Sequence, residues 1–173
     1  MKVEAVGMWT EPKLVQRSEQ PYAAIKVLVT MQELAEVVPP LNGEVFGWLA
    51  EHGATPAGPP FWKYNVIDMA RQLEIEAGVT VDAPITGDDR VRAGALPSGT
   101  YATLTHTGHP DSLMEATAAL LQYGDEHGWR WDRADTAEGD RWASRLEFYL
   151  TDPQDEPDLT KWETELAFRI ADR

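Results

Sequence analysis

The sequence predicts an α+β fold, built as two pseudo-symmetric βαββ repeats with an antiparallel sheet and a central ligand groove. Two observations lead to this fold class. The tripeptide Glu51-His52-Gly53 recurs as Glu126-His127-Gly128. Around each copy the predicted elements follow in the same order, which is strand, helix, strand and strand. Two copies of one unit meet at a junction, and clefts at such junctions commonly bind small molecules.

We expect one domain preceded by a short extension. Residues 1–12 have little periodicity and are interpreted as an N-terminal extension, whereas residues 13–173 form the domain. Repeat one covers about 13–83 and repeat two about 91–171, with a polar connector over 84–89. The 173 residues are 43% apolar, which is enough to build a buried core.

Repeat one contains a helical segment that prolines interrupt. Pro39-Pro40 breaks any single long helix, because a proline inside a helix removes a backbone hydrogen bond. Gly53 is placed to end the helix in a left-handed cap. The expected elements are strands at 13–17 and 22–30, helix within 31–53, a rigid proline-rich loop at 54–60, and strands at 61–66 and 72–77, the last closed by Gly78.

Repeat two follows the same order after a turn at Pro97-Ser98-Gly99. Asp111 or Ser112 is expected to cap its helix, which ends before Gly128. The expected elements are strands at 91–96 and 101–107, the helix, a charged loop at 132–141, a strand at 146–150, an acidic loop at 151–159 and a strand at 162–170.

The charge balance excludes several classes of partner. The net charge is -14, and the 15 basic residues form no cluster. A nucleic-acid binder needs a basic face, so direct nucleic-acid binding is not expected. No apolar run approaches the ~20 residues that span a bilayer, and no secretory signal opens the chain, so we expect a cytoplasmic protein without a membrane segment. The negative field favours cationic ligands, or it serves solubility alone.

The strand around Glu147 has two chemically different faces, because alternate side chains of a strand point to opposite sides. One face is apolar and is expected to pack on a helix, and the other carries polar groups. The two sets are Leu146, Phe148 and Leu150, and Arg145, Glu147 and Tyr149.

Matching the two repeats brings aromatic residues to the polar face. When Tyr149 is matched to Tyr64, Trp62 falls opposite Glu147. Aromatic faces with one carboxylate suit a flat or cationic apolar ligand. The candidate ligand-binding residues are Glu147, Tyr149, Trp62, Tyr64 and Trp142, the last because it lies near a strand edge where an aromatic residue can rim a pocket. The alternative is that Trp62 is a core residue and Glu147 a solvated one.

No cofactor or metal site is expected. The chain has no cysteine and four histidines, and His106 and His109 resemble no zinc motif. His52 and His127 lie at predicted helix ends, where a cation favours the helix dipole. The acids at 152–158 lack the central glycine of a calcium loop, and no glycine-rich phosphate loop is present.

These features together resemble the GyrI-like small-molecule-binding domain over residues 13–171. The resemblance is carried by the repeated order, by Phe61-Trp62-Lys63-Tyr64-Asn65 after a Gly/Pro loop, and by Glu147-Phe148-Tyr149-Leu150. It implies two halves around a groove. It also implies that Glu147 matches the glutamate which meets lipophilic cations in the effector-binding domains of multidrug-responsive regulators. No helix-turn-helix precedes residue 13, so the resemblance implies a stand-alone member.

Three functions follow as hypotheses. The leading one is binding of lipophilic aromatic, often cationic small molecules, for sensing or sequestration. The second hypothesis is hydrolysis of strained cyclopropane-bearing genotoxic compounds, because some stand-alone members of the family that this chain resembles are hydrolases of such compounds. That resemblance implies Glu147 as the group that activates water and Tyr149 as a proton donor. The third hypothesis is an acidic inhibitor module that binds a basic protein. The sequence leaves open whether the protein is an enzyme, its physiological ligand and its oligomeric state.

Overall fold

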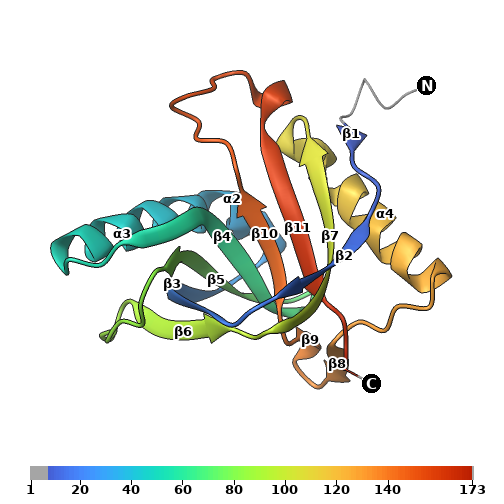
Figure 1. The fold of residues 1–173 in the computed structure, drawn as a ribbon, viewed down its shortest axis with the longest axis horizontal. Coiled ribbons are helices and arrows are strands. Elements are labelled where there is room, and N and C mark those ends of the chain that lie inside the picture. Colours follow the sequence, from blue (N-terminus) through green and yellow to red (C-terminus); the bar gives the residue numbers. More distant parts are fainter. Residues whose placement is uncertain (1–7, 173) are drawn as a thin grey trace.

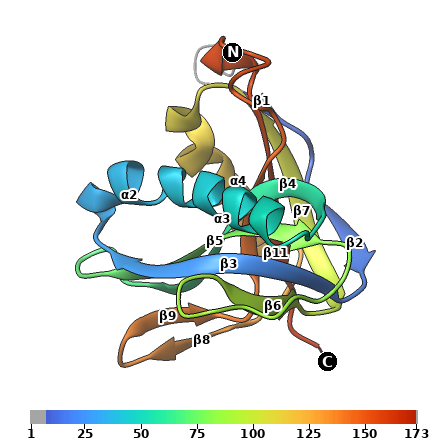
Figure 2. The same cartoon turned by 90° about the vertical axis from the view of Figure 1, so that its left-hand side faces the viewer.

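The computed structural model describes residues 8–172 of the chain. Within these residues the strands form an antiparallel sheet, and the long helices pack against it (Figure 1). Figure 2 shows α2, α3 and α4 on the same side of the strands at the near edge of the sheet, with β8 and β9 projecting on the other. The predicted α+β class is confirmed.

The first half of the chain follows the expected order, with strands before a broken helical segment and two strands after it. Its elements are β1 (Met8–Trp9), β2 (Lys13–Arg17), β3 (Gln20–Val29), α2 (Met31–Val37), α3 (Pro39–Glu51), β4 (Pro56–Ile67) and β5 (Leu73–Val81).

The second half repeats this order and adds a hairpin and two short 3-10 turns. Its elements are β6 (Arg92–Leu96), β7 (Gly99–Thr107), η1 (Pro110–Ser112), α4 (Leu113–Glu126), β8 (Arg133–Thr136), β9 (Gly139–Trp142), β10 (Arg145–Tyr149), η2 (Leu159–Lys161) and β11 (Glu163–Arg169).

The strand order relates the two halves by pseudo-twofold symmetry. The middle of the sheet runs β3-β5-β4-β10-β11-β7, so β4 of one half pairs with β10 of the other. Each half also exchanges its first strand, because β2 pairs with β7 and β6 pairs with β3. This exchange interlocks the halves and favours one domain. The repeat boundaries at about 13–83 and 91–171 stay a prediction.

The helical segment of the first half breaks at the expected prolines. The Thr30 hydroxyl accepts a hydrogen bond from the Glu33 amide at 3.2 Å, and the Glu33 carboxylate accepts one from the Thr30 amide at 2.9 Å. This reciprocal capping box starts α2. Helix α3 then begins at Pro39, since a first-turn residue has no need of an N–H donor.

The repeated tripeptides end α3 and α4 in the same way. Gly53 and Gly128 follow the helices with φ of 69° and 73°, the left-handed conformation that glycine adopts without a Cβ clash. The histidine before each glycine stacks on an aromatic residue one turn back. The stacked pairs are His52 with Trp48 and His127 with Tyr123, whose ring centroids lie 3.8 Å and 3.9 Å apart. The repeated tripeptide is thus explained by helix termination.

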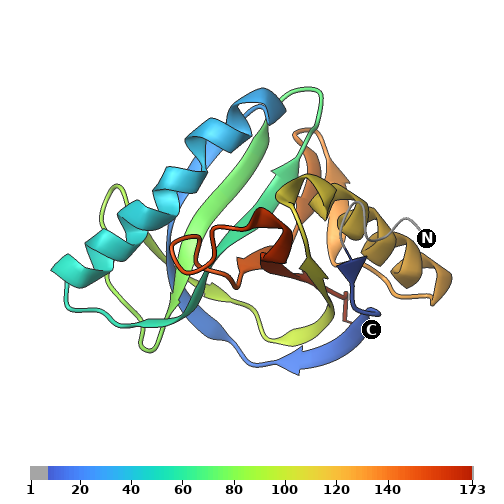
Figure 3. The ribbon, with the colours of Figure 1, turned by 90° about the horizontal axis from the view of Figure 1, so that it is seen from above.

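Both long helices pack on one face of the sheet and leave its middle between them. Helix α3 buries Val45 and Leu49 over β5, and α4 buries Ala116 and Leu120 over β7 and β11. Figure 3 shows the two helices apart, with the link from β10 to β11 between them in this view. The central strands β4 and β10 therefore form the floor between the two helices.

The apolar side of β10 packs on strands. Leu146 and Phe148 are buried in a cluster with Phe61 of β4 and Tyr22 of β3. The prediction that this face packs on a helix is wrong, because the curved sheet brings its own outer strands over it. Leu150, predicted to share this face, lies beyond the strand and is 44% exposed.

Two segments predicted as loops belong to the sheet. Strand β4 already begins at Pro56, and its pairing with β5 is irregular between Pro56 and Pro60, where prolines cannot donate to the ladder. The charged segment at 132–141 contains the β8–β9 hairpin, and β9 extends the sheet beside β4. Both predictions are based on local composition. The strand pairing depends on partner strands that are distant in the sequence.

Gly78 does not end β5, which runs on to Val81. Gly78 lies opposite Phe61 in the β4–β5 ladder. A Cβ at this position would lie 2.6 Å from the Phe61 Cζ and 3.1 Å from the Ala23 carbonyl oxygen. The glycine is explained by the close approach of an aromatic ring, and the predicted strand end is wrong.

Among residues 8–172, no helix has the length and apolar character needed to cross a membrane.

Replacement of Gly78 by alanine is expected to destabilise the protein by about 1–3 kcal/mol, because the added methyl overpacks the Phe61 ring. Chemical unfolding followed by circular dichroism measures this change. Gly47→Ala in α3 is the matched control, since no atom beyond its chain neighbours and the surrounding helix backbone lies within 4 Å of a Cβ there. That variant should gain roughly 0.5–1 kcal/mol from helix propensity. Equal effects of the two substitutions would contradict the packing explanation.

Candidate functional site

The candidate site lies on the floor between α3 and α4, where β4 pairs with β10. The register places Trp62 directly opposite Glu147. Tyr64 and Tyr149 are two residues further along their strands and share this face. The structure thus brings together four of the five residues predicted from the sequence, and each of the four side chains is partly exposed.

The Glu147 carboxylate is held by two tyrosine hydroxyls. Tyr149 donates a hydrogen bond to Glu147 Oε1 at 2.6 Å, and Tyr64 donates to the same oxygen at 3.1 Å. Within residues 8–172, no side chain donates to Glu147 Oε2. One carboxylate oxygen is therefore fixed in place, and the other is free to accept a bond from a ligand or a water.

Aromatic rings are positioned around the carboxylate by a residue that sequence reasoning missed. The Trp62 ring meets Tyr149 edge to face, with centroids 5.2 Å apart. The Trp62 indole N–H donates to Asn42 Oδ1 at 2.7 Å. The Asn42 amide in turn donates to the backbone carbonyls of Phe61 and Gly78, at 3.2 Å and 3.1 Å.

Asn42 is a positioning residue, since it fixes the tryptophan from helix α3 and is itself buried. A polar amide at a buried helix position needs partners for its donors and acceptor. The signal in the sequence was the asparagine beside the apolar positions Leu41 and Val45 of a predicted helix. Nothing in the sequence indicated that its partner is Trp62.

Burial and hydrogen bonding have opposite effects on the pKa of Glu147. Burial raises the pKa of Glu147, and the hydrogen bonds from Tyr149 and Tyr64 and the charge of Arg145 oppose that shift. Burial and the charge of Glu147 raise the pKa of both tyrosines well above the ordinary value. The tyrosines are therefore neutral hydrogen-bond donors. The strands and rings around the carboxylate remove most of its water, although one edge of the cluster reaches solvent.

Arg145 is a second charge on the same face. Its guanidinium carbon lies 4.6 Å from the ring centroid of Phe168, 4.9 Å from that of Trp142 and 5.9 Å from that of Tyr64. Burial lowers the pKa of Arg145, and the charge of Glu147 partly offsets this. The strand alternation predicts Arg145 on this face, but it indicates no role for the residue.

Trp142 is separated from the other predicted residues. Its side chain is buried, 4% exposed, in the cluster under α4, and its indole N–H donates to Asp140 at 2.9 Å. Trp142 joins the candidate site only through Arg145, which stacks on it. Its predicted role in ligand binding is not supported by a direct contact with Glu147 or the tyrosines.

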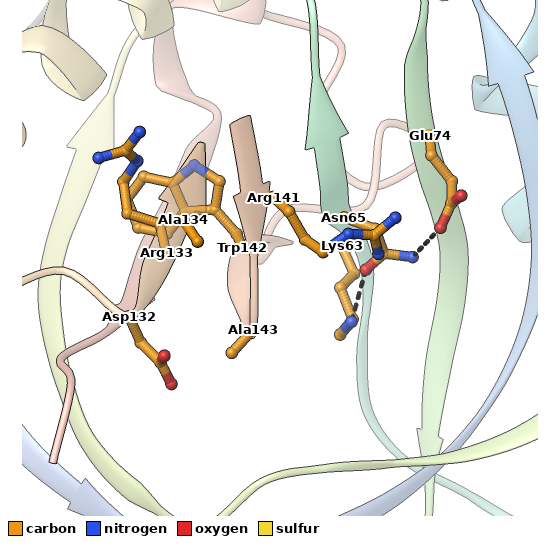
Figure 4. Close-up of a pocket in the computed structure, with 9 residues that line it drawn as sticks. All are labelled: Lys63, Asn65, Glu74, Asp132, Arg133, Ala134, Arg141, Trp142 and Ala143. Atoms are coloured by element: carbon orange, nitrogen blue, oxygen red, sulfur yellow. Dashed lines mark hydrogen bonds between the residues drawn. The ribbon is translucent and has the colours of Figure 1, made fainter. Parts of the chain in front are cut away.

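One cavity lies on the other face of β4 (Figure 4). It measures about 500 Å³ and is lined by Lys63, Asn65, Glu74, Asp132, Arg133, Ala134, Arg141, Trp142 and Ala143. Several of its charged groups are already paired within the protein, whereas Arg141 has no ion pair within residues 8–172. Lys63 forms an ion pair with Glu76 at 3.6 Å, and Asp132 forms one with Arg169 at 2.6 Å. The cavity therefore offers few free polar groups to a ligand.

The Glu147 cluster, in contrast, is filled by its own side chains. It lines neither that cavity nor a second one of about 620 Å³ beside Asp88 and Arg92. The edge-to-face contact of Trp62 with Tyr149 and the two tyrosine hydrogen bonds close it. The carboxylate is therefore reached at the partly exposed edge of the cluster, where its second oxygen has no donor among residues 8–172.

A buried histidine–serine contact lies near the N-terminus of α4. His106 Nε2 and Ser112 Oγ are 2.6 Å apart, and the Ser112 hydroxyl donates to the His109 carbonyl at 2.9 Å. Ser112 occupies the expected capping position of α4, but its side chain makes no cap bond. These bonds hold η1 against β7. Among the described residues, no group of three His, Asp or Glu side chains is placed to hold a metal ion.

Comparison with solved structures supports the fold. The C-terminal domain of EcmrR is 19% identical, and the match covers 94% of this chain and 98% of that domain with a TM-score of 0.72. In the EcmrR–DNA complex the identity is 20% and the TM-score 0.73, and the chain spans 58% of the EcmrR chain.

Two further relatives have the same fold at lower identity. SAV2435 bound to tetraphenylphosphonium is 11% identical, with 94% of each chain covered and a TM-score of 0.60. A hydrolase from Listeria innocua is 13% identical, with 93% of this chain and 92% of that chain covered and a TM-score of 0.59. At these identities the likeness establishes the fold alone. No curated protein sequence matches the chain.

The family profile of the GyrI-like small molecule binding domain matches residues 10–171. This range includes every strand and helix from β2 to β11, and thus both halves of the pseudo-symmetric sheet. The chain belongs to the GyrI-like small molecule binding domain family.

Proposed function

We propose that the protein binds lipophilic aromatic, often cationic small molecules at the Glu147 cluster, for sensing or sequestration. The observation that carries this proposal is the Glu147 carboxylate itself. It lies among aromatic rings, with one oxygen held by two tyrosines and the other unbonded among residues 8–172.

The electrostatics of the cluster suit a lipophilic cation. Desolvation destabilises the charged form of a carboxylate, as the raised pKa of Glu147 indicates. A positive charge bound beside the carboxylate stabilises that form and offsets the desolvation. A lipophilic cation also loses little hydration when it leaves water. The faces of Trp62, Tyr64 and Tyr149 add apolar area and attract positive charge through their ring quadrupoles.

A relative with the same fold supports the ligand class. The SAV2435 structure holds tetraphenylphosphonium, which is a lipophilic cation with aromatic rings. Its identity of 11% to this chain is too low to transfer a ligand by sequence. The support comes from the combination of that ligand class with a desolvated carboxylate in this chain.

Glu147→Gln is expected to weaken the binding of cationic dyes much more than the binding of neutral dyes of the same shape. A charge-assisted contact contributes about 1.5–3 kcal/mol, so the dissociation constant of a cationic dye should rise roughly tenfold or more. Fluorescence titration with a matched cationic and neutral pair measures this. Glu163→Gln, on the neighbouring strand β11, is the control for a general change of charge, because Glu163 is exposed and makes no ion pair within residues 8–172. Equal losses for both dye classes would show that Glu147 acts through shape or folding.

Binding of a cationic dye should also weaken as the pH falls. The carboxylate is charged above its pKa and neutral below it, and burial raises the pKa of Glu147. The affinity is therefore lost at a higher pH than for an ordinary glutamate, whose pKa is about 4.3. Dissociation constants measured between about pH 4.5 and 8 test this. Glu147→Gln should give a flat profile, and an identical fall in that variant would assign the titration to another group.

Hydrolysis of strained cyclopropane-bearing compounds is the second candidate. Tyr149 and Tyr64 both point their hydroxyls at Glu147, which gives a carboxylate and a proton donor within 2.6 Å of each other. A raised pKa keeps Tyr149 protonated, as a general acid requires. The free oxygen of Glu147 is placed to activate a water. The Listeria innocua relative described as a hydrolase has the same fold.

Tyr149→Phe separates the two candidates. The variant keeps the ring, so a binding protein should retain most of its affinity for aromatic dyes. A hydrolase that uses the Tyr149 hydroxyl should lose turnover of a cyclopropane-bearing alkylator by roughly a hundredfold or more, followed as product formation by chromatography. Turnover that survives unchanged in both Tyr149→Phe and Glu147→Gln would place the chemistry at other residues. An absence of turnover in the parent protein would favour binding alone.

A further inference from the structure

Among residues 8–172, Arg145 differs from the other enclosed arginines because its guanidinium has no ion-pair or hydrogen-bond partner in the protein. Arg17 pairs with Glu165 at 2.9 Å, and Arg169 pairs with Asp132 at 2.6 Å. Within residues 8–172, the Arg145 guanidinium makes neither an ion pair nor a side-chain hydrogen bond, and Glu147 and Asp140 act on it only through space. Its N–H groups are therefore left to solvent or to a ligand.

The surroundings of Arg145 fix its guanidinium in place. The group lies against the rings of Phe168 and Trp142, at 4.6 Å and 4.9 Å from their centroids. Stacking holds a planar guanidinium by its faces, so the N–H donors at its edge remain available. An ordered guanidinium with free donors matches a carboxylate or another planar acceptor, which it binds through two parallel hydrogen bonds.

Arg145 and Glu147 lie on the same face of β10, two residues apart. Two residues of a strand span about 6.6 Å, which is within the length of a small aromatic molecule. A ligand between α3 and α4 therefore meets a carboxylate at one point and a guanidinium at another. A purely cationic ligand is attracted by Glu147 and repelled by Arg145.

We propose that Arg145 is a second polar anchor of the site and that the site selects amphoteric aromatic ligands, which carry an acidic group besides a positive charge. This inference rests on the proposed binding function and narrows its ligand class. The acidic group pairs with Arg145, the positive group pairs with Glu147, and the aromatic body packs against Trp62 and Tyr64.

Rhodamine B and its ethyl ester test the proposal as a matched pair. Both carry the same cationic xanthene, but only rhodamine B has a free carboxylate. Fluorescence polarisation titrations of each dye are made at neutral pH with the full chain. The wild type should bind rhodamine B at least as tightly as the ester. Arg145→Gln should raise the dissociation constant of rhodamine B roughly tenfold or more, as expected for a lost charge-assisted pair. The dissociation constant of the ester should rise by no more than about threefold, or fall.

Two variants protect the test against a loss of folding. Arg145→Met keeps an unbranched side chain between Phe168 and Trp142, and it should lose the preference for rhodamine B as the glutamine variant does. Arg145→Lys keeps the charge without the planar fork and should retain part of the preference. Thermal unfolding of each variant shows that it is folded before the dyes are compared.

The outcomes distinguish this inference from the proposed function. If wild type binds the ester and prefers it tenfold over rhodamine B, or if Arg145→Gln changes both dyes equally, the role of Arg145 is overturned and the binding function stands. If wild type binds neither dye, the proposed function and this inference are both overturned. A selective loss of rhodamine B in the glutamine and methionine variants supports the anchor.

Discussion

The pairing of β4 with β10 sets Trp62 directly opposite Glu147 and joins the two halves of the sheet. The other features of the site follow from this contact. Because the halves are related by pseudo-twofold symmetry about it, each half places its helix on the same face and to one side. The floor between the helices is then made from the one strand pair that belongs to both halves.

The exchange of first strands makes this central pairing robust. Strand β2 crosses to β7 and β6 crosses to β3, so neither half can form its edge without the other. The opposite face is closed by Tyr22, Phe61, Leu146 and Phe148, which form a core made from strands alone. The helix-covered face has its own apolar clusters under α3 and under α4, and its polar groups lie on the floor between them.

Those polar groups are costly for the fold, and the proposed binding function rests on them. Burial raises the pKa of Glu147 and lowers that of Arg145, so each charged form is disfavoured where it stands. Two tyrosine hydroxyls hold one oxygen of the carboxylate, and a tryptophan fixed by Asn42 packs against one of these tyrosines. Sites that bind charged ligands are commonly destabilised in this way before the ligand arrives. Arg145 and Glu147 place one positive and one negative group on the floor between the helices, whereas a glutamate alone would make this surface negative only.

The sequence by itself determined the α+β class, the repeated order of elements, the helix ends at Gly53 and Gly128, and the shared face of Glu147 and Tyr149. Each of these depends on periodicity or on the backbone preference of one residue. The tertiary structure alone decided which face the helices cover, that 54–60 and 132–141 contribute strands, and that Asn42 and Arg145 belong beside the site. These features depend on contacts between residues far apart in the chain, such as the 83 positions that separate Tyr64 from Glu147. Local patterns carry no information about such partners, because the same alternation is compatible with either face of a sheet.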